Sequence, residues 1–148
     1  MKQKFIDAHM KAAEVYAELS SAKRLQVGCV IVKDNTIIGI GYNGMPSGWD
    51  NNCEMVKHTD FTGTVVTVSK PEILHSETNA IAKVAKSTNS TDGATMFITH
   101  APCLDCAKLV YQSGINSVYY RNSYRNDVGI DFLKKCEIEV CQVKPCNS

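Results

Sequence analysis

The chain has 148 residues and a mass of 16.3 kDa, the size of one domain that buries enough apolar surface to fold without a metal or a disulfide. Its hydrophobic content of 44% and charged content of 21% exclude a disordered chain, a coiled coil and a collagen-like repeat. A net charge of +1 without a charged tract argues against a large nucleic-acid partner, and no apolar run is long enough for a membrane span. We expect a single domain over residues 1–148 that stays in the cytoplasm.

The periodicity of apolar residues predicts alternating helices and strands. An amphipathic helix is expected over 5–19, followed by a hairpin of strands at 27–33 and 36–41 that forms the centre of a sheet. Residues 43–70 lose this periodicity and predict a long functional loop. Beyond the loop we expect helices over 75–87, 103–113 and 130–135, alternating with strands over 94–99, 117–121 and 137–143. This order predicts an α/β fold, a three-layer α/β/α sandwich around a mixed sheet of about five strands.

The seven cysteines are an odd number and cannot all pair within the chain, which favours reduced thiols or a metal site. Cys103 and Cys106 lie at the start of a predicted helix, so both sulfurs project from its first turn. The helix dipole lowers the thiol pKa at that end and favours thiolate ligands for zinc. A structural or incidental pair is the alternative for this motif taken alone.

His75 and Glu77 stand at the start of another predicted helix and change that balance. Two crossovers around one strand would bring both helix starts to the same edge of the sheet. His75, Cys103 and Cys106 then supply three ligands and leave a fourth tetrahedral position for water, as in a catalytic zinc site. Glu77 is placed to carry protons beside that water, although a helix-terminal glutamate that only stabilises the dipole is the alternative.

The spacing His-x-Glu followed by Pro-Cys-x-x-Cys is the signature of zinc nucleobase deaminases. The whole chain resembles the deoxycytidylate (dCMP) deaminases of that superfamily, including those encoded by viruses. Residues 26–32, the Gly-Tyr-Asn-Gly segment within 39–48, and residues 107–115 carry the resemblance further. It implies a cytidine deaminase-like fold, one catalytic Zn²⁺ per chain, and hydrolysis of dCMP to dUMP and ammonia, which supplies the thymidylate precursor. A virus-encoded member would act in the cytoplasm of the host cell.

The same resemblance implies roles for four further residues. The backbone carbonyl of Ala101 would accept a hydrogen bond from the exocyclic amine, and Asn43 would hold the sugar hydroxyl. Tyr124 would lie over the nucleotide, and Arg24 would bind its phosphate. From the residues themselves, the aromatic and cationic mixture over 119–125 suits a base with one phosphate, with a solvated strand end as the alternative.

Regulation and assembly are also implied by the resemblance. Similar enzymes form hexamers, are activated by dCTP and are inhibited by dTTP, with the triphosphate often bound together with Mg²⁺. We carry this over to Asn43, Gly44 and Lys86 as the effector site. Some relatives hold a second, structural zinc, to which Cys53 and His58 would contribute. That site is left unassigned, because Ala22 stands where those relatives have a further cysteine.

Other functions remain open at this point. The aromatic and cationic residues could also stack single-stranded bases, so a cytidine or tRNA-type deaminase, or one that edits single-stranded nucleic acid, is the alternative. A zinc-binding module without catalysis is a third, which would leave Glu77 without a purpose.

Overall fold

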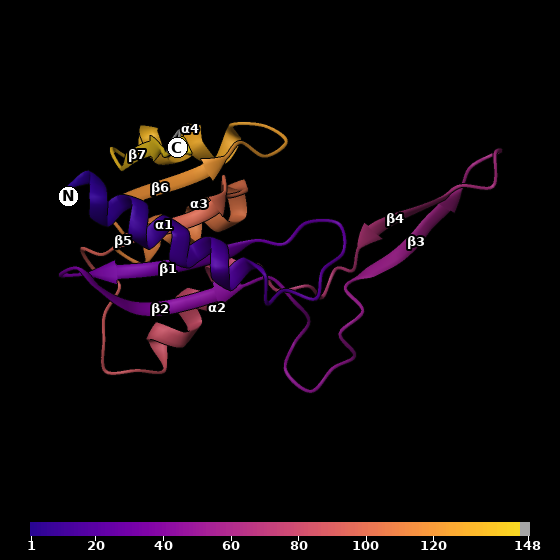
Figure 1. Ribbon diagram of the computed structural model, residues 1–148, viewed down its shortest axis with the longest axis horizontal. Coiled ribbons are helices and arrows are strands. Elements are labelled where there is room, and N and C mark those ends of the chain that lie inside the picture. Colours follow the sequence, from indigo (N-terminus) through magenta and orange to yellow (C-terminus); the bar gives the residue numbers. More distant parts are fainter. Residues whose placement is uncertain (146–148) are drawn as a thin grey trace.

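The computed structural model describes residues 1–145, which form an α/β body and a hairpin that extends from it (Figure 1). Among these residues, no helix has the length and apolar character needed to cross a membrane. In chain order the elements are α1 (Gln3–Ala17), β1 (Gly28–Lys33), β2 (Thr36–Tyr42), β3 (Glu54–Thr59), β4 (Val65–Ser69), α2 (Ser76–Ala85), β5 (Thr95–His100), α3 (Leu104–Gln112), β6 (Ser117–Asn122), α4 (Val128–Lys135) and β7 (Glu139–Gln142).

The body contains a five-stranded mixed sheet in the order β2-β1-β5-β6-β7, which confirms the predicted α/β class. β1 pairs antiparallel with β2 and β5, whereas β5, β6 and β7 run parallel and are joined through α3 and α4. The predicted hairpin of β1 and β2 is confirmed, and its turn places Asp34 and Asn35 at φ 50° and 59°, as tight hairpins require.

The hairpin lies at one edge of the sheet and not at its centre, so that part of the prediction was wrong. β1 is buried along almost its whole length, whereas most residues of β2 are only partly buried. A strand with apolar residues on both faces takes an inner position, because both faces can then be covered. β5 therefore pairs with the free side of β1, and β2 remains the edge strand.

Helices cover both faces of the sheet, which confirms the three layers. Along β1, Val30 and Val32 pack with Met10 of α1 on one face. Cys29 and Ile31 point to the opposite face, where the buried residues of α2, α3 and α4 gather. Successive side chains of a strand alternate between faces, so this one short run contributes to both layers of the core.

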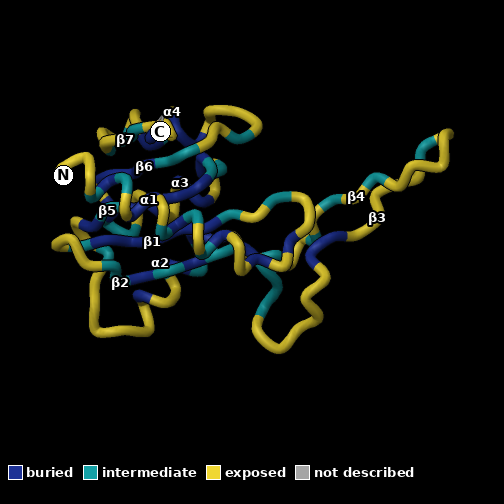
Figure 2. The backbone as a smooth tube through the Cα atoms, viewed as in Figure 1, coloured by how far each residue is buried: buried dark blue, intermediate teal, exposed yellow. Residues whose placement is uncertain are grey.

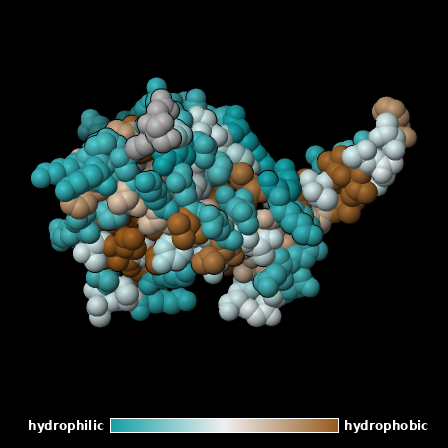
Figure 3. Space-filling view, in the orientation of Figure 1, coloured by the Kyte–Doolittle hydropathy of each residue, from teal (hydrophilic) through white to brown (hydrophobic). Residues whose placement is uncertain are grey.

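Residues 54–69 form a two-stranded hairpin, which we call the arm, that extends away from the body (Figure 1). Most of the arm is exposed (Figure 2), and hydrophobic side chains appear along it (Figure 3). The expectation of an irregular loop over 43–70 was therefore wrong for this stretch. The alternating run of β4 was a strand signal, and Gly63, at φ +84°, completes the turn.

Candidate active site

The three predicted metal ligands lie together. The Nδ1 atom of His75 is 3.3 Å from the Sγ atom of Cys106 and 3.8 Å from that of Cys103. All three ligand atoms lie within 4.8 Å of one another. In a tetrahedral zinc site with one imidazole and two thiolates, ligand atoms are separated by about 3.5–3.8 Å. The donor set and its spacing therefore fit zinc.

Two helix starts create this cluster. His75 and Cys103 are the residues that precede α2 and α3, and both have extended backbones. The first turn of α2 lies against β2 at Gly41, where any side chain would collide with the carbonyl of Ser76. Gly129 of α4 likewise lies against the carbonyl of Pro102, directly before α3. Both helix starts are thus held by close packing that only glycine permits at these two positions.

The cluster favours a thiolate. The pKa of Cys103 is lowered to about 4, chiefly because the Cys106 thiol and then the His75 ring donate hydrogen bonds to it. The pKa of Cys106 is raised, because it is the proton donor in that pair and because it is buried. The pKa of His75 is raised, first by its hydrogen bond to Cys103. One negative charge is therefore already stabilised where a cation would bind.

Glu77 lies in the first turn of α2 and is 4% exposed. Its Oε2 atom accepts a hydrogen bond of 3.1 Å from the hydroxyl of Ser76. Burial raises the pKa of Glu77, because the charged carboxylate loses its hydration. A carboxyl group with a raised pKa can hold and release a proton closer to neutral pH, which is the property that a proton carrier needs.

A cavity of about 240 Å³ lies over this cluster. We call His75, Glu77, Cys103 and Cys106 the floor; Cys106 lies just beneath the lining and is 3% exposed. The cavity is also lined by four residues that the resemblance assigned to the nucleotide, namely Arg24, Asn43, Ala101 and Tyr124. Segments far apart in the sequence thus meet at the predicted site.

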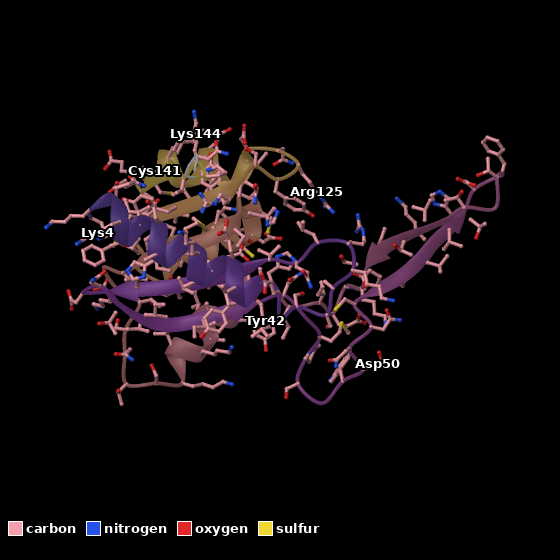
Figure 4. All side chains as sticks on the ribbon, in the orientation of Figure 1. Lys4, Tyr42, Asp50, Arg125, Cys141 and Lys144 are labelled. Atoms are coloured by element: carbon pink, nitrogen blue, oxygen red, sulfur yellow. The ribbon has the colours of Figure 1, made fainter. Side chains whose placement is uncertain are left out.

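The cavity adjoins a second one of about 790 Å³, and seven residues line both. We call its four cationic residues, Arg24, Lys57, Lys70 and Arg125, the mouth. Figure 4 shows Arg125 on the loop after β6, on the side of the body from which the arm extends. None of the four forms an ion pair within residues 1–145, and Glu77 is the single acidic residue among those lining either cavity. This opening therefore favours an anion.

Lys57 and Lys70 were missed by the sequence reasoning. Both belong to the stretch that was expected to be an irregular loop. The position of a lysine side chain relative to the site cannot be predicted in such a loop. Had the alternation of β4 been taken as a strand, the arm's own residues would have been candidates for the mouth. Ser69, the last residue of β4, lines both cavities as well.

The aromatic and cationic cluster expected over 119–125 is divided by the fold. Tyr119 stacks on Phe97 in the core, with ring centroids 5.1 Å apart, and Arg121 pairs with Glu14 at 2.7 Å. Tyr124 and Arg125 do line the cavity. The Arg125 guanidinium lies 5.0 Å from the centroid of the Tyr124 ring.

Asn43 serves the local structure as well as the cavity. Its side-chain oxygen accepts the N–H of Val27, and its amide donates to the carbonyl of Leu25, both at 2.8 Å. The adjacent Gly44 pairs with Leu74, next to the ligand histidine. Lys86 caps the far end of α2 and lines neither cavity described above.

Among the described residues, Cys53 and His58 do not form a second metal cluster. The one group of three metal-ligating side chains within residues 1–145 is that of His75, Cys103 and Cys106. Cys53 is buried, and its sulfur is 3.5 Å from the hydroxyl of Ser21. His58 lies on the exposed part of the arm.

Comparison with known proteins relates this chain to the cytidine and deoxycytidylate deaminases. Residues 3–122 match the family described as the cytidine and deoxycytidylate deaminase zinc-binding region. ComE operon protein 2 of Bacillus subtilis is 36% identical over 121 residues, and the alignment covers 78% of this chain and 58% of the relative. Deoxycytidylate deaminase of enterobacteria phage T4 is 31% identical over 172 residues, covering 93% of this chain and 89% of the phage protein.

Solved structures show the same fold. The dCMP deaminase of cyanophage S-TIM5, crystallised with dCMP and dUMP, is 42% identical and superposes with a TM-score of 0.86. The match covers 97% of this chain and 99% of the cyanophage chain. The predicted cytidine deaminase-like fold is thereby confirmed.

Proposed function

Because the chain belongs to the cytidine and deoxycytidylate deaminase family, we propose that it hydrolyses dCMP to dUMP and ammonia. The observation that carries the proposal is the combination of floor and mouth in adjoining cavities. The floor offers a His-Cys-Cys metal site beside a buried carboxyl group. The mouth offers four cations, none neutralised by a carboxylate in the lining. A deoxycytidylate would match both features, with its cytosine base at the floor and its phosphate at the mouth.

His75, Cys103 and Cys106 would hold one zinc ion per chain. When bound, zinc acts as a Lewis acid and lowers the pKa of its water toward about 7. Two thiolates and one imidazole leave one tetrahedral position free, which distinguishes this set from a closed structural site. The lowered pKa of Cys103 supports metal binding at neutral pH, because thiolates are the ligating form.

Glu77 would move the protons of the reaction. Its carboxylate takes a proton from the attacking water and delivers it to N3 of cytosine. It then takes the proton of the hydroxyl group formed at C4 and delivers it to the amine that leaves, so that C4 becomes a carbonyl. Water supplies the oxygen, and the C4–N bond breaks as ammonia departs. Burial of Glu77 supports this role, because its raised pKa brings the proton affinities of donor and acceptor closer together.

The remaining lining residues would orient the nucleotide. The carbonyl of Ala101 would accept a hydrogen bond from the exocyclic amine, and Asn43 would contact the sugar hydroxyl. Tyr124 would lie over the nucleotide near its base and phosphate, and its edge-on contact with His100, with ring centroids 6.3 Å apart, supports that position. Arg24 would bind the 5′-phosphate, since a guanidinium matches the geometry of phosphate oxygens.

The test is a deamination assay with the purified zinc-loaded protein, following the loss of cytosine absorbance and the release of ammonia. We expect turnover of dCMP and slower turnover of deoxycytidine, which lacks the phosphate that the mouth would bind. Cytidine and a single-stranded oligonucleotide test the alternative classes. Activity on cytidine or on the oligonucleotide, without activity on dCMP, would contradict the proposal.

We also propose that the protein is a homo-oligomer, with a hexamer expected from the resemblance, activated by dCTP and inhibited by dTTP with Mg²⁺. Asn43, Gly44 and Lys86 are the proposed effector residues. Asn43 binds the backbone of Leu25 and Val27, which follow Arg24, and Gly44 pairs with Leu74, the residue before His75, so a ligand there would shift both. Sigmoidal dCMP kinetics that dCTP makes hyperbolic support this regulation, whereas kinetics indifferent to both triphosphates would exclude it.

A further inference from the structure

Glu54 is a buried carboxylate outside the floor. It is the first residue of β3, where the arm joins the body, and it is 7% exposed. Its Oε1 atom accepts two backbone hydrogen bonds, from the N–H of Lys23 at 2.7 Å and from that of Arg24 at 3.1 Å. Its Oε2 atom is buried without a hydrogen-bond partner among the described residues.

The stability of the fold does not explain this arrangement. A buried carboxylate loses its hydration; the two hydrogen bonds to Oε1 recover part of that loss, and the unpartnered Oε2 leaves the rest uncompensated. A neutral side chain at this position would avoid the cost. What Glu54 does supply is a fixed position for two consecutive amides of the segment 20–27, which contains neither helix nor strand.

Two side chains from outside this segment bind its backbone, and they bind different parts of it. Asn43 binds the backbone of Leu25 and Val27, which line the cavity over the floor. Glu54 binds the backbone at Arg24, whose side chain lines both cavities. The base end and the phosphate end of the nucleotide site thus have separate anchors.

We propose that Glu54 is the positioning residue for the phosphate end of the site, because it fixes the backbone from which Arg24 extends. This inference rests on the proposed function. An exposed arginine loses conformational freedom when it binds a phosphate, and a fixed backbone reduces that loss. Glu54 therefore acts on the binding of nucleotides, but neither on the binding of nucleosides nor on the proton transfer by Glu77.

Three variants test this role. Glu54→Ala removes the acceptor of both backbone hydrogen bonds, and we expect it to raise KM for dCMP about tenfold while kcat changes little. Glu54→Gln retains an acceptor oxygen and should keep KM within about threefold of the parent. Asp60→Ala is the matched control, because Asp60 also accepts hydrogen bonds from two backbone N–H groups, at 2.9 Å each. Asp60 lies at the turn of the arm, away from the segment that contains Arg24. This control should leave KM unchanged.

Deoxycytidine and a double mutant separate positioning from general damage. Kinetics with deoxycytidine should be the same for Glu54→Ala and for the parent. In an Arg24→Ala background, Glu54→Ala should cause no further loss for dCMP, since the residue through which it acts is gone. Equal losses for dCMP and deoxycytidine, additive losses in the double mutant, or no loss in Glu54→Ala would each overturn the inference.

Binding of the product keeps the test independent of turnover. The calorimetric affinity for dUMP, compared with that for deoxyuridine, reports on the phosphate end alone. If the protein binds dUMP through Arg24 without deaminating dCMP, the proposed function fails, while the role of Glu54 is still decided by these affinities. If Glu54→Ala does not fold by circular dichroism, Glu54→Asp replaces it. That shorter carboxylate should weaken dUMP binding at least threefold, and unchanged binding would overturn the inference.

Discussion

The floor and the mouth of the cavity are built in different ways. The floor residues come from the starts of two helices that pack on one face of the sheet, and Glu77 and Cys106 are almost completely buried. The mouth residues come from the segment 20–27, the arm, the residue directly after the arm and the loop after β6, and most are exposed. Close packing fixes the floor, whereas a few hydrogen bonds fix the mouth.

This difference separates reaction from recognition. Proton transfer and metal binding need fixed distances and a low-dielectric setting, which a packed core provides. Binding of a phosphate needs cations that remain hydrated until the ligand arrives, which an exposed rim provides. Changes at the floor should therefore act on turnover, and changes at the mouth should act on nucleotide affinity.

The largest effect is expected at the metal ligands. Cys103→Ala or Cys106→Ala should reduce the zinc content from one ion per chain to near zero and abolish deamination, because each removes one of three ligands. Atomic absorption and the assay with dCMP measure both changes. For the parent, a chelator should abolish activity and added zinc should restore it. A ligand variant that is free of zinc but fully active would remove the metal from the proposed mechanism.

The next largest effect is expected at Glu77. Glu77→Gln should lower kcat by at least about a thousandfold, because the proton carrier is lost. Zinc content and dUMP affinity should be retained, since the amide is similar in shape to the carboxyl group. Turnover comparable to that of the parent would exclude Glu77 from proton transfer.

The same variant also tests the burial of this carboxyl group through stability. The folded-state pKa of Glu77 is raised above its unfolded value, so its contribution to stability is fully present below the ordinary glutamate pKa and is lost as pH rises from there through the raised folded-state pKa. Without zinc, Glu77→Gln should therefore unfold at a higher temperature than the parent at pH 7. The difference should shrink toward pH 4. Equal melting temperatures at both pH values would contradict the predicted cost of burying this charge.

A smaller effect is expected at Arg24. Arg24→Ala should raise KM for dCMP by about ten- to a hundredfold while changing kcat little, because a charge-assisted contact to the phosphate is lost. Deoxycytidine kinetics should not change. Arg121→Ala is a control, since that arginine pairs with Glu14 away from the cavity. A loss of kcat in Arg24→Ala, with KM unaffected, would mean that the mouth takes part in the reaction itself.

The smallest effect is expected from salt. Between 0.05 and 0.5 M salt, KM for dCMP should rise by about two- to fivefold, because exposed cations are screened over a Debye length of about 10 Å at 0.1 M. The kcat for dCMP and the kinetics with deoxycytidine should stay constant, because the proton carrier Glu77 is buried. A kcat that falls with salt in parallel would remove the distinction between the two regions.

The sequence predicted the order of the helices and strands of the body, and the cluster of His75, Cys103 and Cys106. Those predictions succeeded because apolar periodicity and the spacing of ligands at helix starts are local properties. The position of β2 at the edge of the sheet could not be predicted from such local patterns. The order of the strands depends on which strands have two apolar faces that helices must cover. The arm was missed because the alternation in β4 extends over only five residues, β3 shows no such alternation, and the two strands lie largely exposed outside the core.

What the sequence determined by itself was the reactive group: a His-x-Glu and a Cys-x-x-Cys at helix starts specify ligand types, a proton carrier and their approximate spacing. Only the tertiary structure decided which cations surround that group. Arg24, Lys57, Lys70 and Arg125 are separated by up to about a hundred positions along the chain and have no common motif, yet they line one opening. The physical reason is that helix starts are placed by local backbone preferences, whereas an exposed rim is assembled by long-range contacts such as that between Glu54 and the amides of Lys23 and Arg24.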